Sequence, residues 1–192
     1  MKNIKTKIRQ KLQESAYVKL LLLQRCAKPL EDAVSVVITA LRKGRSVYLL
    51  GNGGSAADAQ HIAAELQGRF YKNRKPLPIL ALTTNTSLLT AVGNDYGYEK
   101  VFSRQVEAHV KKGDIVIAIS TSGNSPNVLD AIKVANRRGA ITIGLGGRTG
   151  GKMKHLVKHC LLAPSNDVAR IQECHTTMGH ILCDVVESEL FR

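Results

Sequence analysis

The sequence contains no tryptophan, and aromatic residues make up only 4% of its 192 positions. A surface of aromatic side chains that stacks on nucleic-acid bases is therefore not expected. No apolar stretch approaches the roughly 20 residues that span a membrane. Residues 1–9 are basic, but no signal-type apolar core follows them. These absences predict a cytoplasmic protein with no membrane partner and no nucleic-acid partner.

Cysteine is sparse, and its four occurrences include no Cys-x-x-Cys pair. A chain of this length can bury a sizeable core without disulfides, so we expect reduced thiols packed as small apolar side chains. Cys160 follows His155 and His159, which could suggest a metal cluster. The lysines that surround this group would repel a cation, so we do not expect a metal there.

Acidic residues are few, with 15 Asp and Glu against 28 Lys and Arg, and the formal net charge is +13. Residues 1–50 hold eleven of the basic residues and only three acidic ones. Three interpretations fit this bias: a solvated helix face, a field that steers an anionic metabolite, or a nucleic-acid surface. The scarcity of aromatic residues weighs against the third.

Apolar residues account for 44% of the chain, which suits one domain over residues 1–192. Residues 4–25 and 30–42 carry apolar positions at helical spacing, so two N-terminal helices are predicted within residues 1–43. Gly44 would end the second of them. An α/β core is expected over residues 44–192.

This core alternates short apolar runs with helical stretches. Strands are predicted at 46–50, 79–82, 114–120, 140–145 and 160–163. Helices are predicted at 55–68, 87–92, 100–110, 126–138 and 168–190. The pattern is typical of a three-layer α/β sandwich with a five-stranded parallel sheet, as in flavodoxin-like and Rossmann-like folds.

Two loops of this core have the composition of phosphate-binding loops. Gly51-Asn52-Gly53-Gly54-Ser55 and Ser120-Thr121-Ser122-Gly123-Asn124-Ser125 each stand between a strand and a helix. Their glycines let backbone N–H groups approach a ligand, and the following helix N-terminus favours anions. Neither loop matches a nucleotide-binding signature. A polar turn is also predicted at 93–97, where Asn94 and Asp95 either only form the turn or hold sugar hydroxyls.

His61 and Glu65 are four residues apart on a predicted helix, and so share one face. On sequence alone they could be a metal pair, an acid–base pair or a surface salt bridge. On the last helix, His180 lies beside apolar positions and is the better candidate for a buried role. His175 is expected to face solvent or a neighbouring helix.

Taken together, these segments are distinctive: residues 51–61, Glu65, Val92-Gly93-Asn94-Asp95, residues 120–125, and Arg170-Ile171-Gln172-Glu173 with His180. In this order they resemble the phosphoheptose isomerase family of sugar isomerase (SIS) domain proteins, over about residues 10–190. The serine-containing loops mark the wider SIS group. The combination of His61, Glu65, Gln172 and His180 is far more specific.

The resemblance implies an aldose–ketose isomerase that converts sedoheptulose 7-phosphate to D-glycero-D-manno-heptose 7-phosphate through an enediol. This is the first step toward nucleotide-activated heptose for lipopolysaccharide. The resemblance also implies a homotetramer with active sites at subunit interfaces, and one zinc ion per site. The implied zinc ligands are His61, Glu65, Gln172 and His180.

The resemblance further implies that Glu65 and His180 are catalytic, as base and as acid. The implied substrate-binding residues are Asn52, Gly53, Gly54, Ser55, Glu65, Asn94, Asp95, Ser120, Thr121, Ser122, Ser125 and Gln172. Gln172 and His180 would lie about 12 Å apart along one straight helix. Either Gln172 precedes regular helix, or the metal sits midway, or the ligands come from different subunits.

The chain departs from the family pattern in two respects. Ala169 stands where some relatives have an acidic residue, and the charge of +13 is unusual for such an enzyme. The alternative is a non-catalytic SIS-domain protein that binds a replication initiator or another macromolecule. The presence of all four proposed zinc ligands favours the isomerase.

Overall fold

The sheet at the centre of the molecule has five parallel strands. The computed structural model describes residues 2–191, and the strand order is β2-β1-β3-β4-β5. The strands are β1 (Val47–Gly51), β2 (Ile79–Ala81), β3 (Ile115–Ser120), β4 (Ile141–Gly146) and β5 (His159–Leu162). Central strand β3 is buried along its whole length, which is why it reads as an uninterrupted apolar run. The predicted three-layer α/β architecture is confirmed.

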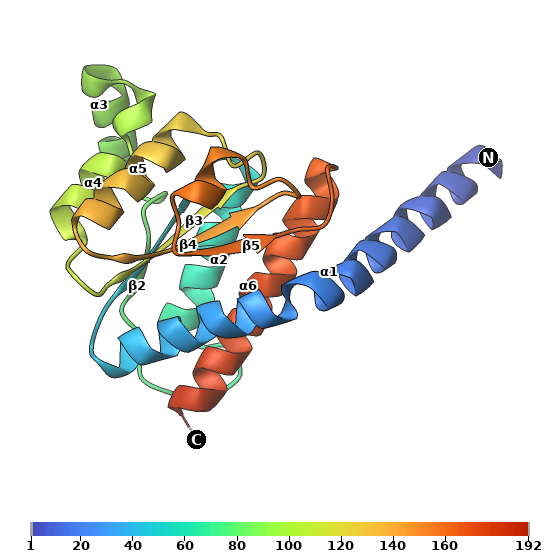
Figure 1. Ribbon diagram of the computed structural model, residues 1–192, viewed down its shortest axis with the longest axis horizontal. Coiled ribbons are helices and arrows are strands. Elements are labelled where there is room, and N and C mark those ends of the chain that lie inside the picture. The colour runs from blue at the N-terminus through green and yellow to red at the C-terminus, as the bar shows by residue number, and fades with distance from the viewer. Residues whose placement is uncertain (1, 192) are drawn as a thin grey trace.

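Helices cover both faces of the sheet (Figure 1). One face carries α1 (Lys2–Arg42), α2 (Gly54–Gln67) and α6 (Val168–Leu190). The other carries α3 (Thr86–Tyr96), α4 (Ser103–His109) and α5 (Pro126–Arg137), with the short 3-10 turns η1 (Tyr98–Lys100) and η2 (Gly151–His155). Strand β3 contributes to the apolar core on each face of the sheet. Ile117 packs in the core under α2 and α6, and Val116 packs in the core under α4 and α5. Within residues 2–191, no helix combines the length and apolar composition that crossing a bilayer requires.

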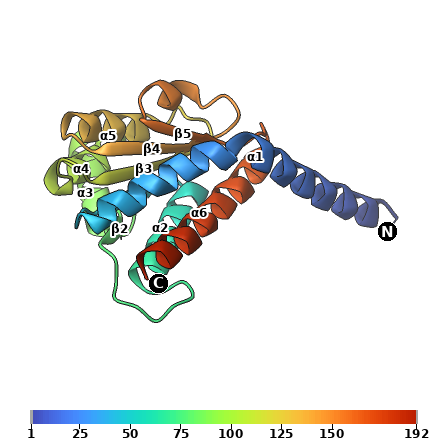
Figure 2. The same ribbon diagram turned by 60° about the horizontal axis from the view of Figure 1, so that its bottom comes forward.

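The two predicted N-terminal helices are one helix, so that prediction is wrong. Pro29 lies inside α1, where it cannot donate to the carbonyl of Arg25 and crowds it, which bends a helix. Figure 2 shows α1 bent between a projecting N-terminal part and a part that lies along α6. The helix continues through Pro29 because apolar side chains on both sides of it, such as Cys26 and Leu30, are buried in the same core.

The predicted turn at 93–97 is also wrong in part. Residues 93–96 form the last turn of α3, and the chain leaves the helix at Gly97, whose φ is 87°. Val92 is buried and anchors this last turn. Polar residues such as Asn94 and Asp95 occupy its exposed side. Because Gly97 alone in this turn has a positive φ, which glycine adopts without strain, it and not the polar pair terminates the helix.

The strand order places a crevice between β1 and β3. These strands are neighbours, but α2 leaves β1 toward one face of the sheet, and α5 leaves β3 toward the other. The loops that follow the two strands therefore diverge at their carboxyl ends. Open α/β sheets bind ligands at such a switch point. Both predicted phosphate-binding loops lie there.

Candidate active site

The first loop leads from β1 directly into α2. Gly53 has a φ of 55°, and the backbone N–H of Ser55 donates to the carbonyl of Asn52 at 2.9 Å. Ser55 is buried, whereas Gly53 and Gly54 are exposed. No acidic residue occupies the first turn of α2. The exposed glycines therefore present the N-terminus of α2, where backbone N–H groups and the helix dipole favour an anion.

The second loop leads from β3 into α5 and collects hydroxyl groups. The Oγ atoms of Ser120 and Ser125 lie 3.1 Å apart, and Ser122 Oγ accepts from the backbone N–H of Asn124 at 3.1 Å. Neighbouring segments hold the loop in place, since Gly147 N donates to Thr121 O at 3.0 Å. The predicted hydroxyl cluster is thus present and backed by the loop after β4. It is suited to donate hydrogen bonds to a phosphate.

A pair of amides joins the two loops. Asn52 Nδ2 donates to Asn127 Oδ1 at 2.9 Å, and Asn127 Nδ2 donates to Asn52 Oδ1 at 2.8 Å. Asn127, in the first turn of α5, was not among the predicted site residues. The partner is 75 residues away, so local sequence could not have identified the pair.

The second part of the site lies where α2 and α6 run side by side in the same direction. Nε2 of His61 and Nε2 of His180 are 2.7 Å apart, and the same His61 atom is 3.8 Å from Glu65 Oε1. One imidazole must hold the shared proton while the other accepts it. The predicted pair Glu65 and His180 therefore contact a common imidazole within one chain.

Close helix packing brings these groups together. A Cβ at Gly179 would lie 2.8 Å from Ile62 Cδ1, so the absence of a side chain lets α6 approach α2 at the level of the histidines. Farther toward the helix N-termini, Thr176 Oγ1 donates to Asp58 Oδ1 at 2.8 Å. The resulting polar seam runs along both helices.

Gln172 lies at the other end of this seam, against Gly54. It belongs to regular helix α6, so the possibility that it precedes the helix is wrong. Eight residues of helix, about 12 Å, separate it from His180. Within one chain, the structure thus divides the four proposed zinc ligands: His61, Glu65 and His180 are together, and Gln172 is beside the first loop.

The segment after α2 is held by a buried carboxylate. Glu187 accepts from the backbone N–H groups of Phe70, Tyr71 and Lys72 and from Nε of Arg74, at 2.6 to 3.0 Å. Burial opposes its ionisation, but these hydrogen bonds outweigh burial and lower the pKa of Glu187 to about 2.

The guanidinium of Arg74 extends this anchor to the end of α2. It donates to the carbonyl oxygens of Glu65, Leu66 and Gly68 at 2.8 to 3.0 Å. These carbonyls would otherwise lack a partner at the helix C-terminus. The backbone of Glu65 is therefore fixed through Arg74 by Glu187 on α6.

His175 differs from its prediction because it is fully buried. Its Nε2 lies 3.2 Å from the carbonyl oxygen of Gly146, at the end of β4. Burial lowers the pKa of His175, which favours the neutral ring.

The predicted sugar-binding residues Asn94 and Asp95 contact each other at 2.8 Å on the exposed side of α3. Tyr98, just beyond them, extends its hydroxyl to 3.5 Å from Asn52 Oδ1.

The chemistry of the His61–Glu65–His180 group matches a zinc donor set. Two imidazole nitrogens and one carboxylate are the three protein ligands of many catalytic zinc sites. In the described part of the chain, no three His, Cys, Asp or Glu side chains already surround one point as a closed metal cluster. His61 instead lies between the other two, and short side-chain rotations would be needed for all three to face a common centre.

Comparison with known proteins identifies the family of this chain. The SIS domain model matches residues 14–147. A phosphoheptose isomerase from Aquifex aeolicus (strain VF5) is 54% identical over 181 residues, which cover 94% of this chain and 95% of that protein. One from Aneurinibacillus thermoaerophilus is 49% identical over 187 residues, with 96% and 94% coverage.

Solved structures agree as well. Phosphoheptose isomerase GmhA from Neisseria gonorrhoeae superposes with a TM-score of 0.92 at 41% identity, covering 96% of this chain and 99% of that one. The Francisella tularensis enzyme gives a TM-score of 0.93 at 34% identity, with 95% and 97% coverage. The chain belongs to the SIS domain family and, within it, to the phosphoheptose isomerases.

Proposed function

We propose that this chain is an aldose–ketose isomerase that converts sedoheptulose 7-phosphate to D-glycero-D-manno-heptose 7-phosphate. One observation carries the proposal: Glu65 and His180 contact the same imidazole, about two helical turns along α2 from the phosphate-binding loops. The substrate has a matching arrangement, because its phosphate is on the last carbon and its reacting carbons are at the opposite end. A phosphate on the loops would thus direct the carbonyl toward Glu65 and His180.

The reaction moves a proton between two adjacent carbons. Glu65 removes a proton from C1 of the ketose while the C2 oxygen gains one, which produces the enediol. A proton is then delivered to C2 and the O1 hydroxyl proton leaves, which completes the aldehyde. A carboxylate and an imidazole beside the substrate can perform both exchanges, and His180 is the acid of this pair.

Zinc is part of the proposal, with His61, Glu65 and His180 as the residues that would hold it. A coordinated carboxylate or imidazole nitrogen cannot exchange a proton, so Glu65 and His180 would have to change their coordination during turnover. When bound, zinc would polarise the substrate carbonyl and stabilise negative charge on the enediolate oxygens. Gln172 lies too far along α6 to join these three from the same chain, so it would complete the set from a neighbouring subunit. In its own chain, Gln172 lies beside the first loop and is placed to bind substrate.

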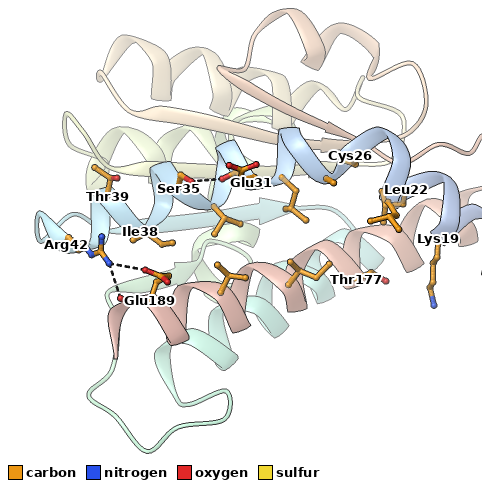
Figure 3. Close-up of a pocket in the computed structure, with 16 residues that line it drawn as sticks. Lys19, Leu22, Cys26, Glu31, Ser35, Ile38, Thr39, Arg42, Thr177 and Glu189 are labelled. Carbon is orange, nitrogen blue, oxygen red and sulfur yellow. Dashed lines mark hydrogen bonds and ion pairs between the residues drawn. The ribbon is translucent and has the colours of Figure 1, made fainter. Parts of the chain in front are cut away.

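The proposed homotetramer is supported by an apolar groove between α1 and α6, which we call the α1–α6 groove. It has a volume of about 680 Å³, and its apolar lining includes Leu22, Leu23, Leu30, Val34, Ile181 and Val185. Figure 3 shows Leu22, Ile38 and Thr177 facing this groove, with the Arg42–Glu189 pair at one end. Leu23 is 67% exposed. Ile181 and Val185 are exposed as well, and exposed apolar side chains gathered in this way are typical of a protein interface.

The decisive experiment is incubation of the purified protein with sedoheptulose 7-phosphate, with and without a chelator. We expect formation of the aldoheptose phosphate, and its loss after chelation followed by recovery on addition of zinc. Absence of turnover in the presence of added zinc would refute the isomerase. The alternative, a non-catalytic SIS protein that binds a replication initiator, is not favoured, because the reacting residues are intact and the compared relatives are isomerases.

The downstream role follows the same proposal. The product would enter the synthesis of nucleotide-activated heptose for lipopolysaccharide. The cytoplasmic location expected from composition stays a prediction.

A further inference from the structure

The reciprocal amide pair between Asn52 and Asn127 links the first phosphate-binding loop to the first turn of α5, which follows the second loop directly. Asn127 is 3% exposed. A buried primary amide is costly unless its donors and acceptor find partners. Here the partner is the side chain of a predicted substrate-binding residue.

The orientation of this pair is determined by the backbone of α5. Asn127 Oδ1 also accepts from the N–H of Val128 at 3.0 Å, so the oxygen of Asn127 must face α5 and Asn52 Nδ2. The Asn127 NH₂ group then faces Asn52 Oδ1. A flipped Asn52 would place two oxygens, and two NH₂ groups, against each other. Val128 thus determines, through Asn127, which way the amide of Asn52 points.

The NH₂ group of Asn52 has two hydrogens, and only one of them is used by Asn127. We propose that Asn127 is a positioning residue that aims the second N–H of Asn52 into the crevice, as a donor to a sugar hydroxyl. The pair also fixes the spacing between the first and second loops. This inference rests on the proposed isomerase function, because the sugar phosphate is the ligand that would use the donor.

The test is a double-mutant cycle of Asn52→Ala and Asn127→Ala, measured as KM and kcat for sedoheptulose 7-phosphate. We expect each single variant to raise KM about tenfold with a smaller effect on kcat, since one oriented hydrogen bond is lost. The double variant should resemble Asn52→Ala alone, because Asn127 acts through Asn52. Asn166→Ala, on an exposed loop residue, is the matched control and should leave KM unchanged.

Asn127→Asp provides a variant of nearly the same shape in case alanine disturbs folding. Its carboxylate can still accept from Val128 N–H and Asn52 Nδ2, but it opposes Asn52 Oδ1 with a second oxygen. We expect a raised KM with a melting temperature close to that of the parent. An unchanged KM in both Asn127 variants would overturn the proposal. So would a double alanine variant whose rise in KM equals the product of the rises in the two single variants.

Two measurements separate this inference from the proposed function. If the parent protein fails to isomerise sedoheptulose 7-phosphate, the isomerase proposal fails by itself. The side-chain amide signals of Asn52 in an ¹⁵N-labelled sample still report on the pair. We expect Asn127→Ala to move these signals while Asn166→Ala leaves them in place. Unmoved Asn52 signals would contradict the positioning role whatever the activity.

Discussion

His61 and His180 face each other Nε2 to Nε2 at 2.7 Å, from helices whose sequences are 119 residues apart. Two neutral rings can share one proton at this distance, but two protonated rings would repel each other strongly. The two Nε2 atoms could instead both bind one cation placed between the rings. The pair therefore joins α2 to α6 and supplies two of the three nitrogen and oxygen donors proposed for zinc.

The catalytic assignment predicts the effect of removing either reacting group. Glu65→Gln and His180→Ala should each lower kcat by at least about 100-fold, the usual scale of general acid–base catalysis. The fold should persist, since both side chains are only partly buried. Turnover of sedoheptulose 7-phosphate and circular dichroism are the measurements. His155→Ala, at an exposed histidine outside the site, is the control. Normal kcat in either variant would remove the assignment.

The zinc assignment predicts metal content independently of turnover. Protein purified with zinc and dialysed should retain about one equivalent per subunit, measured by elemental mass spectrometry. His61→Ala should lose most of it, because His61 contacts both of the other proposed ligands. His109→Ala, on α4, should retain it. Equal zinc in the parent and His61→Ala would show that the metal binds elsewhere.

The Glu187 anchor predicts an acid-sensitive contribution to stability. Its pKa is about 2 in the folded state, below the ordinary value of about 4.3. A lowered carboxyl pKa stabilises the fold at neutral pH, and this contribution disappears as the pH falls from about 4.3 to about 2. The shift corresponds to about 3 kcal/mol, taken as an order of magnitude.

Urea unfolding of Glu187→Gln at neutral pH should therefore show a loss of about 3–5 kcal/mol, because Arg74 is left buried without its partner. The difference from the parent should shrink as the pH approaches 2. Glu107→Gln, at an exposed carboxylate, should cost less than about 0.5 kcal/mol. A pH-independent difference between parent and Glu187→Gln would contradict the lowered pKa.

A pair of glycine variants tests how tightly the second loop is held. Gly123 has a φ of 64°, and a Cβ there would overlap the backbone of Gly150. Gly53 has a φ of 55°, but a Cβ would meet nothing within 4 Å. Gly53→Ala should cost about 1–3 kcal/mol of backbone strain. Gly123→Ala should cost clearly more and raise KM. Equal melting temperatures for the two variants would argue against the packed loop.

The α1–α6 groove predicts that assembly depends on Leu23. Leu23→Glu should reduce the mass measured by light scattering from that of a tetramer to that of smaller species, because a charge in an apolar interface is costly. Tyr71→Glu, at a residue that is 71% exposed outside the groove, is the control. A tetramer that tolerates Leu23→Glu would place the interface elsewhere.

The strands and the two phosphate-binding loops could be predicted because each signal is local. Buried parallel strands such as β3 are unbroken apolar runs. A glycine-rich loop before a helix can be recognised from about five consecutive residues. The continuity of α1 could not be predicted, because a proline such as Pro29 ordinarily interrupts a helix and only tertiary packing on both sides of it keeps α1 in one piece. Tertiary context also decided the burial of His175.

Residues that act through distant partners were harder to predict. Glu187 received no role because its partners lie more than 110 residues earlier, and nothing near it in sequence indicates a backbone anchor. Asn127 was missed for the same reason. His61, Glu65 and His180 were found through their resemblance to a family pattern, since spacing alone left a surface salt bridge equally plausible.

The position of α6 in the chain has a consequence for synthesis. This helix supplies His180, Gln172 and the Glu187 carboxylate, and it also packs along α1, which is translated long before it. Until residues 168–190 have been translated, the nascent polypeptide has an uncovered α1, an unanchored segment after α2 and half of its histidine pair. Isomerase activity should therefore emerge in one step, late in translation, and α1 must wait for a partner that is made more than 120 residues later.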